Sequence, residues 1–367
     1  MKKMFSALLA LAMMVSLVSC GNQTNTPSDA SKSSGSSQSS SASQSGGSAS
    51  SSDQGQWDLT NVEAATLKLA HIYAPEHPFT IGLDKFSEQV YELSEGKLEI
   101  AHYPAAQLGD EPSLHEGLKN GSIDMVVMGI SEAGKDYEPV LVMDAPFIFS
   151  DAKQMLAAND SELGQKLWAD FADASDITML SPIYYGARQL TTNKSVSSVA
   201  DLAGLKIRVP SQENSVAVWN TLGATATPMN LSEVYLSLQT GVVDGQENPI
   251  ATIISSGFDE VCGYMNMTSH SVQNCPLFIA SSVYEKLDPT LKEILDYCVD
   301  TYVSAISQDV IDYENGMIDE IRADGKMEVN ENVDVAGFRE KLADYIQAGA
   351  ATWGEGVYDT LAATPVN

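Results

Sequence analysis

The sequence predicts an α/β protein with two lobes, a ligand cleft between them and a long C-terminal helical region. Strand-like and helix-like patterns alternate along one block of the chain and again along a second block. This rhythm is typical of mostly parallel sheets covered by helices. From Pro289 onward the pattern is helical over most of the remaining length. Because ligands of open α/β sheets bind beyond the carboxyl ends of the strands, the space between two such sheets is the expected site.

The first block begins with a strand and an amphipathic helix. Residues 66–72 alternate polar and apolar side chains, as a half-buried strand does. Pro78 suits the first turn of a helix, and Gly96 suits the position just past its end. Apolar residues between them recur at spacings of four and three, which gives one apolar face: Phe79, Leu83, Phe86, Val90 and Leu93. The block continues with a strand at 98–103, a short helix at 114–120 and a strand at 125–128.

The second block repeats this order and leads into the helical region. Its expected elements are strands at 177–185 and 206–209, a helix marked by Val216, Trp219 and Leu222, a helix at 231–238 and a strand at 242–246. The helical region that follows also has one apolar face, formed by Tyr284, Leu287, Leu291, Ile294, Leu295 and Cys298.

The N-terminus has the pattern of a targeting segment. Lys2 and Lys3 precede an almost wholly apolar run at 5–18, which is shorter than the roughly 20 residues that span a bilayer and fits the apolar core of a signal peptide. The segment ends in the letters LVSC at Cys20, which resemble the lipobox of bacterial lipoproteins. We therefore expect a signal peptide over residues 1–19 and a lipid on Cys20. The alternative is an ordinary secretory signal with a chance cysteine.

The stretch after Cys20 has the composition of a linker. It consists mainly of Ser, Gly, Gln and Thr, with no large apolar side chain before Trp57. Such a segment cannot bury enough surface to offset its chain entropy. Residues 20–56 are therefore expected to be a lipid-anchored Ser/Gly-rich linker that holds the globular part at the extracytoplasmic face of the cell membrane.

The charge of the chain limits its partners. The formal net charge is −29, and a surface this acidic argues against nucleic acid and anionic lipid headgroups as partners. Against this background, any local cluster of positive charge needs an explanation.

The cysteines and histidines show no metal-ligand spacing, so no metal or cofactor is expected. The four cysteines are Cys20, Cys262, Cys275 and Cys298. With Cys20 assigned to a lipid, the odd number left means at least one free thiol. A disulfide between Cys262 and Cys275 and buried free thiols both remain open, because the sequence gives no geometry.

Two of the four arginines are candidate ligand contacts. Arg188 follows the strand-like letters SPIYYGA, and Arg208 lies in the strand-like letters LKIRVP. An arginine among apolar strand residues is costly unless it is paired, and its planar fork suits a carboxylate bidentately. The alternative is an internal salt bridge to one of the 49 acidic side chains, and residue type alone does not separate the two.

Polar residues at two further places are candidate contacts. Asn248, in the letters VVDGQENP, can both donate and accept a hydrogen bond, although Asn before Pro is also ordinary turn chemistry. The letters HIYAPEHP place Glu76 and His77 where they could touch a sugar or an acid. A role at the start of the following helix is the alternative for Glu76.

Four separated stretches, in order along the chain, carry a family resemblance. They are LEIAHYPAAQLGD at 98–110, GARQLTTN at 186–193, DLAGLKIRVP at 201–210 and SEVYLSLQTGVVDGQENP at 232–249. Together they resemble the solute-binding proteins of TRAP transporters, the tripartite ATP-independent periplasmic type.

The resemblance implies a periplasmic-binding-protein-like fold of two α/β lobes joined by crossing strands, with a long helix spanning both. The lobes are then expected at 62–185 plus about 274–313, and at 186–273 plus about 314–362. The fold would close on its ligand by a hinge.

The resemblance also implies the site. The Arg of the KIRVP motif, here Arg208, forms the salt bridge to the ligand carboxylate. The Arg of the GxRQxT motif, here Arg188, is a second contact, and the Asn of QENP, here Asn248, lies on the same side. The acidic residue after LGD, here Glu111, can meet ligand hydroxyls or an amine.

The function implied is capture of a small organic acid outside the cytoplasm and its delivery to TRAP membrane permease subunits. The acid would be a sugar acid such as a uronate, or a dicarboxylate. The chain would not be an enzyme, since no nucleophile with a base stands at convincing spacing. The alternatives are a ligand-sensing lipoprotein that docks on a receptor and, less favoured, an enzyme that modifies sugar acids.

Overall fold

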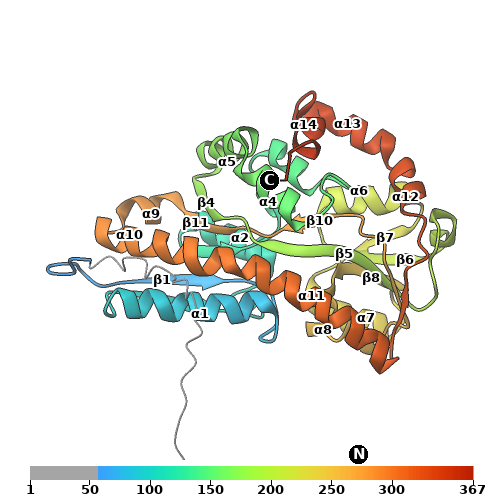
Figure 1. Ribbon diagram of the computed structural model, residues 1–367, viewed down its shortest axis with the longest axis horizontal. Helices are drawn as coiled ribbons and strands as arrows, with labels where there is room; N and C mark the ends of the chain where they lie inside the picture. The colour runs from blue at the N-terminus through green and yellow to red at the C-terminus, as the bar shows by residue number, and fades with distance from the viewer. Residues whose placement is uncertain (1–56, 367) are drawn as a thin grey trace, which may run out of the picture. The chain divides into compact units, whose positions relative to one another are not determined.

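The computed structural model describes residues 57–366 (Figure 1). The expected signal peptide, Cys20 and the whole expected linker at 20–56 lie outside the described residues. Within 57–366, no helix combines the length and the apolar character needed to cross a membrane.

The first sheet has five strands in the order β2-β1-β3-β11-β4. Its members are β1 (Ala65–Ala70), β2 (Leu98–Tyr103), β3 (Met125–Val127), β4 (Ile177–Ser181) and β11 (Leu277–Ala280). Strand β1 pairs in parallel with β2 and β3, whereas β11 is antiparallel to β3 and β4. The parallel part is the βαβ arrangement that the alternating sequence pattern predicts.

The second sheet runs β12-β9-β5-β8-β6-β7, and β10 pairs with β5 beside it. Its strands are β5 (Tyr184–Thr192), β6 (Lys206–Val209), β7 (Thr225–Pro228), β8 (Gly245–Pro249), β9 (Tyr264–Asn266), β10 (Val272–Asn274) and β12 (Glu328–Asn330). Strand β6 is parallel to β7 and β8, and β5 is antiparallel to β8 and β9.

Helices follow most of the strands. The longer ones are α1 (Pro78–Leu93), α2 (Glu111–Asn120), α4 (Ala152–Asp160), α5 (Glu162–Ser175), α6 (Glu213–Leu222), α7 (Leu231–Gln239), α10 (Pro289–Cys298), α11 (Ser304–Asp324) and α13 (Ala343–Trp353). The shorter ones are α3 (Ile130–Ala133), α8 (Ile250–Ser255), α9 (Ser281–Lys286), α12 (Val335–Lys341) and α14 (Val357–Ala362). Three 3₁₀ turns lie at Glu138–Asp144, Val199–Leu202 and Phe258–Glu260, and a π turn lies at Val299–Val303.

One long helical segment reaches both sheets. Helix α10, the π turn and α11 follow one another from Pro289 to Asp324. Helix α11 packs against α1 beside the first sheet and against β5, α8 and β12 of the second sheet, and Figure 1 shows it passing from α1 to α7 and α8. The long C-terminal helix predicted from the sequence is confirmed.

The apolar core is divided between the two sheets. The largest cluster surrounds the first sheet and contains the predicted face of α1. Two smaller clusters lie at the second sheet, one around Trp219 and Phe338 and one around Phe258 and Met265. Burial of each cluster removes apolar surface from water and holds the helices onto its sheet.

Two of the differences between the expected elements and the structure change where site residues lie. The single strand expected at 177–185 is two strands, β4 and β5, and Pro182, which has no N–H to donate to a ladder, lies between them. The strand expected at 242–246 is β8, which begins three residues later because the preceding residues turn back onto α7 through bonds to the Ser237 carbonyl. As a result, Arg188 and Asn248 lie within strands, not after them.

The thiols of Cys262, Cys275 and Cys298 are all free and buried. The disulfide left open by the sequence between Cys262 and Cys275 is therefore absent from the structure. Within residues 57–366, no cluster of three or more His, Cys, Asp or Glu side chains could hold a metal ion.

Candidate functional site

A cavity of about 350 Å³ is lined by residues from elements of both sheets. Its polar lining includes Glu111, Asp144, Arg188, Arg208, Glu247 and Asn248. Aromatic side chains, among them Trp219, Tyr235 and Trp353, contribute to the same lining. A concave site with an apolar wall and a few converging polar groups is typical of small-molecule binding.

Arg208 is a buried cation without a carboxylate partner among residues 57–366. It is the third residue of β6 and is 3% exposed. Its Nε and Nη2 donate to the carbonyl of Met229, at 3.0 and 2.7 Å. A guanidinium carries five N–H donors, so three of them, including both on Nη1, have no partner within the described chain. These donors belong to a side chain that lines the cavity.

The pKa of the Arg208 guanidinium agrees with its lack of a carboxylate partner among residues 57–366. Burial and, to a smaller extent, the nearby charge of Arg188 lower the pKa of the Arg208 guanidinium to about 10, against the opposing effect of Glu247. The group therefore stays protonated at neutral pH while its burial is unfavourable. An anion in the cavity would supply the missing counter-charge.

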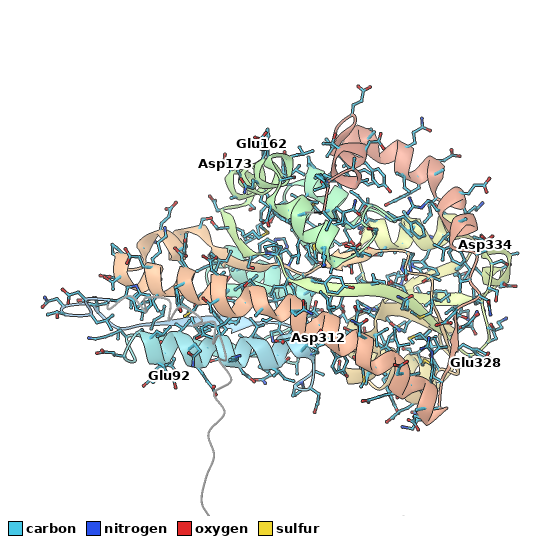
Figure 2. The ribbon with its side chains drawn as sticks, in the orientation of Figure 1. Glu92, Glu162, Asp173, Asp312, Glu328 and Asp334 are labelled. Carbon is cyan, nitrogen blue, oxygen red and sulfur yellow. The ribbon has the colours of Figure 1, made fainter. Side chains whose placement is uncertain are left out.

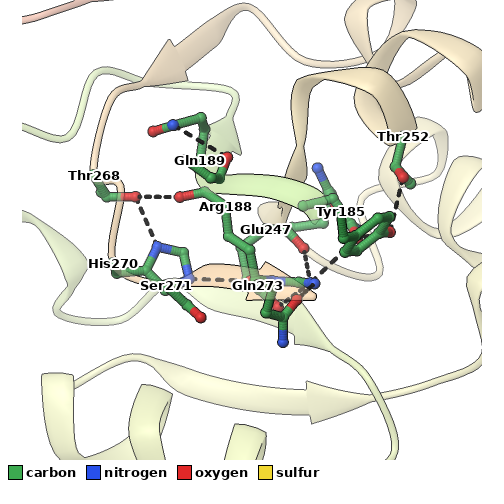
Figure 3. A network of polar contacts seen from close by, with 12 residues as sticks. Tyr185, Arg188, Gln189, Glu247, Thr252, Thr268, His270, Ser271 and Gln273 are labelled. Atoms are coloured by element: carbon green, nitrogen blue, oxygen red, sulfur yellow. Dashed lines mark hydrogen bonds and ion pairs between the residues drawn. The ribbon is translucent and has the colours of Figure 1, made fainter. Parts of the chain in front are cut away.

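Arg188 has a different environment, because it is engaged by a protein carboxylate (Figure 3). Its Nε donates to Glu247 Oε2, and its Nη2 donates to Glu247 Oε1 at 2.8 Å and to the Glu247 carbonyl at 2.7 Å. Burial would raise the pKa of Glu247, but the charge of Arg188 and the bond to His270 lower it to about 2. For Arg188 the internal salt bridge, one of the two interpretations that the sequence left open, is present.

Part of Arg188 still faces the cavity. Its Nη1 donates to Gln273 Oε1 at 2.7 Å, which leaves the second N–H of Nη1 without a partner among residues 57–366. Asn248 lies beside it: its Oδ1 accepts from Arg188 Nη2 at 3.2 Å and from the Tyr185 hydroxyl at 3.1 Å. Its Nδ2 donates to Gln246. The two residues therefore form one hydrogen-bonded wall of the cavity.

Glu111 adds a carboxyl group to the lining of the cavity. It is the first residue of α2, and its Oε1 accepts from the Gly129 N–H at 3.1 Å. Burial raises the pKa of Glu111 to about 7, and the charge of Glu132 adds to the rise, while the Gly129 bond and the two arginines oppose it. Near neutral pH the group can therefore both donate and accept a hydrogen bond.

Glu76 and His77 are placed differently from the other four predicted site residues. Neither is among the residues that line the cavity. Glu76 is exposed, and His77 is fully buried. His77 caps α1 by accepting from the Phe79 N–H through Nδ1 at 3.1 Å, and its Nε2 contacts Thr252. The helix-start role, which was the alternative expected for Glu76, therefore belongs to His77.

Several polar residues of the cavity lining were not predicted from the sequence, among them Glu247, Gln273 and Asp144. Glu247 precedes Asn248, and the antiparallel pairing of β5 with β8 places it opposite Leu190, two positions from Arg188. Only this pairing across 59 residues of sequence brings the ion pair together. Gln273 and Asp144 carry no local signal, because their partners also come from distant segments.

The outer surface contrasts with the cavity. Acidic side chains project from it at many places, including the six labelled in Figure 2. In water these exposed charges interact weakly and are screened within about 10 Å at ordinary salt. The attraction of an anion to the cavity must therefore come from the buried arginines at short range.

A two-sheet α/β fold around a cavity with buried cations defines a protein that binds small solutes. The family model described as bacterial extracellular solute-binding protein, family 7, matches residues 69–352. The chain belongs to this family, and the resemblance to TRAP solute-binding proteins is confirmed.

Individual relatives agree with this assignment. A solute-binding protein of Roseobacter denitrificans is 36% identical over 223 residues, which cover 60% of this chain and 68% of the relative. The sialic acid-binding periplasmic protein of Vibrio cholerae is 31% identical over 278 residues, 76% of this chain and 86% of the relative. A TRAP periplasmic solute-binding protein of a Polaromonas species, solved with bound D-erythronate, is 28% identical with a TM-score of 0.77, covering 83% of this chain and 100% of that chain.

Replacement of the two arginines is expected to change the unfolding free energy by very different amounts. Arg188→Met leaves the Glu247 carboxylate buried with only His270, and breaking a buried pair typically costs about 3–5 kcal/mol of unfolding free energy. Arg208→Met leaves no carboxylate behind, so the unfolding free energy should stay within about 1 kcal/mol of the parent, since removal of a desolvated charge offsets the lost bonds to Met229. Denaturant unfolding of both variants measures this. Equal, large losses in both would show that Arg208 is a structural charge.

Proposed function

We propose that this chain captures a small organic acid outside the cytoplasm and delivers it to TRAP membrane permease subunits. The observation that carries the proposal is Arg208, a protonated guanidinium that lines the cavity with three N–H donors and no carboxylate partner within residues 57–366. A ligand carboxylate can accept two of these bonds in parallel. Arg188 Nη1 and the amide of Asn248 supply further donors on the same wall.

Among organic acids, a sugar acid suits the lining better than a dicarboxylate. Glu111 and Asp144 bring two further acidic groups to the cavity. They can accept hydrogen bonds from ligand hydroxyls, whereas a second ligand carboxylate would be repelled by their charge. This supports a ligand with one carboxylate and several hydroxyls.

The proposal includes binding without turnover. Cys275 lines the cavity, and its thiol is the side chain there to consider as a nucleophile. Burial raises its pKa well above the ordinary value, and the Tyr73 hydroxyl lies 3.1 Å from its sulfur. Since the thiolate is the reactive form, a thiol held protonated is a poor nucleophile.

The proposed location follows from the N-terminal pattern. A signal peptide at 1–19, a lipid on Cys20 and a polar linker would keep the binding unit at the extracytoplasmic face of the cell membrane. We also propose that the two sheets are the centres of two lobes, 62–185 plus about 274–313 and 186–273 plus about 314–362, that close on the ligand.

A thermal-shift experiment on the full chain tests the ligand class. L-galactonate, D-galacturonate, D-erythronate and succinate are compared with neutral D-galactose and cationic choline. A ligand present at about 100 times its Kd adds about 2.7 kcal/mol of stability, so at least one acid should raise the melting temperature and the neutral and cationic compounds should not. Arg208→Met should abolish the shift, because loss of one partner of a desolvated charge pair costs about 2–5 kcal/mol. A shift with D-galactose or choline alone, or an undiminished shift in Arg208→Met, would overturn the proposal.

Binding of the acid should weaken as pH rises through the pKa of Glu111. Because the charge of Arg208 helps hold that pKa down to about 7, a bound anion that neutralises Arg208 should raise it and cause proton uptake. The affinity for the best acid of the panel should then fall by up to about tenfold between pH 6 and pH 9, since one pKa unit corresponds to 1.36 kcal/mol. Calorimetry in two buffers of different ionisation enthalpy measures both quantities.

The matched variants for this experiment lie on one helix. Glu111→Gln removes the titrating group and should flatten the pH dependence. Glu116→Gln, at an exposed position of α2, should leave it as in the parent. An unchanged pH slope in Glu111→Gln would assign the proton to another group.

A further inference from the structure

Three side-chain contacts join segments that follow strands of the first sheet to segments that follow strands of the second. The pairs are Gln212 Nε2 to Glu132 Oε1 at 2.7 Å, Asn230 Nδ2 to Asp110 Oδ2 at 2.9 Å and Asn214 Nδ2 to Ser131 Oγ at 2.9 Å. All six residues lie in the first turn of a helix or just before it, and all but Glu132 line the cavity. These contacts hold the two sheets together around the site.

The Asn214 contact continues into the site through a chain of hydrogen bonds. Ser131 Oγ donates to Asp144 Oδ2 at 2.9 Å. The other oxygen, Asp144 Oδ1, accepts from Gln273 Nε2. Gln273 Oε1 in turn accepts from Arg188 Nη1 at 2.7 Å. The chain therefore runs from Asn214 at the contact between the sheets to Arg188 in the cavity.

The direction of every bond in this chain is fixed by the chemistry of its members. The Ser131 hydroxyl has one hydrogen, which it gives to Asp144, so it can only accept from Asn214. The Asp144 carboxylate accepts on both oxygens, with Ser271 Oγ as a further donor at 3.3 Å. It therefore turns the Gln273 amide so that the carbonyl faces Arg188. An apolar side chain in place of this carboxylate would remove the acceptors of both Ser131 and Gln273.

Asp144 is central to this chain by position as well. It is the last residue of the 3₁₀ turn Glu138–Asp144, and the two bonds that it receives on its two oxygens come from α3 and β10. Within the described residues, neither the Asn230–Asp110 contact nor the Gln212–Glu132 contact leads to Arg188 through such a chain. Asp110 is bonded to Ser113 of its own helix, and Glu132 is bonded to Lys135.

We propose that Asp144 is a positioning residue that couples the Asn214–Ser131 contact to the orientation of Arg188 in the cavity; this rests on the proposed capture of an acid. Loss of the Asn214 contact frees Ser131, which loosens Asp144 and then Gln273. Arg188 Nη1 thereby loses the acceptor that helps to hold its remaining N–H toward the cavity. When the sheets separate, the Arg188 donor loses its alignment at the same time. Closure of the two sheets is therefore linked to retention of the acid.

A double-mutant cycle tests this coupling in the full chain. Asn214→Ala, Gln273→Met and the double variant are compared for the dissociation rate of L-galactonate and, without ligand, for melting temperature. Asn214 and Gln273 have no bond to each other, so independent effects should multiply in rate and add in temperature. Coupling predicts that each single change raises the dissociation rate roughly tenfold and the double variant no more than the larger single. It also predicts a melting-temperature loss about 2 °C smaller than the sum of the single losses.

Three further variants separate coupling from simple destabilisation. Ser131→Ala and Asp144→Ala each cut the chain, so the coupling between positions 214 and 273 should vanish in either background. Asn230→Ala breaks a similar contact that does not lead to Gln273, and its effects should multiply with those of Gln273→Met. Coupling that persists in Asp144→Ala, or that is absent from the parent cycle, would overturn the proposal.

The two readouts distinguish failure of this inference from failure of the proposed function. If L-galactonate does not bind the parent, the melting-temperature cycle alone decides whether the chain couples, and the ligand of the proposed function is at fault. If L-galactonate binds the parent while both cycles are additive, the capture of an acid stands and the role of Asp144 is refuted.

Discussion

The site depends on one constraint, the burial of the Arg208 charge without a protein carboxylate opposite it among the described residues. A protein with 49 acidic side chains has ample material for a partner, yet the nearest bonds of Arg208 are to a neutral carbonyl. Burial of such a charge is unfavourable in the free protein. In the proposed function this cost is recovered when an anion enters the cavity, so the arrangement that weakens folding would favour binding.

The second arginine shows how the rest of the site supports the first. Arg188 is held by Glu247, Asn248 and Gln273, and Glu247 is also bonded to His270 (Figure 3). A cation fixed in this way offers the ligand little free charge but a well-oriented donor. In the proposed function the two arginines would have different roles: Arg208 would supply unneutralised charge, and Arg188 would supply a rigid wall. Rigid, pre-oriented donors reduce the ordering cost of binding.

Much of the fold follows from local patterns, whereas the site follows only in part. Strands β2 and β6 have the predicted bounds, because alternation and a following Pro or Gly are read over a few residues. Arg188 and Arg208 are candidates for a local reason, since an arginine in an apolar strand needs an anion, from the ligand or from the protein. Glu247 has no such local signal, because its partner is brought to it by strand pairing. Glu76 and His77 share a local polarity with the residues that line the cavity, and only the path of the chain at the start of α1 separates them from it.

The central claim is that the carboxylate meets Arg208, and arginine-selective nuclear magnetic resonance tests it most directly. The chain contains only four arginines, so ¹⁵N-arginine labelling gives four Nε signals, assigned by substitution of each in turn. On titration with L-galactonate, or with whichever acid stabilises the chain most, the Arg208 signal should move saturably. Arg322 and Arg339 lie in α11 and α12 and are not part of the cavity lining, so the chemical shifts of their signals should not change. Saturable binding of an acid with an unmoved Arg208 signal would contradict the account.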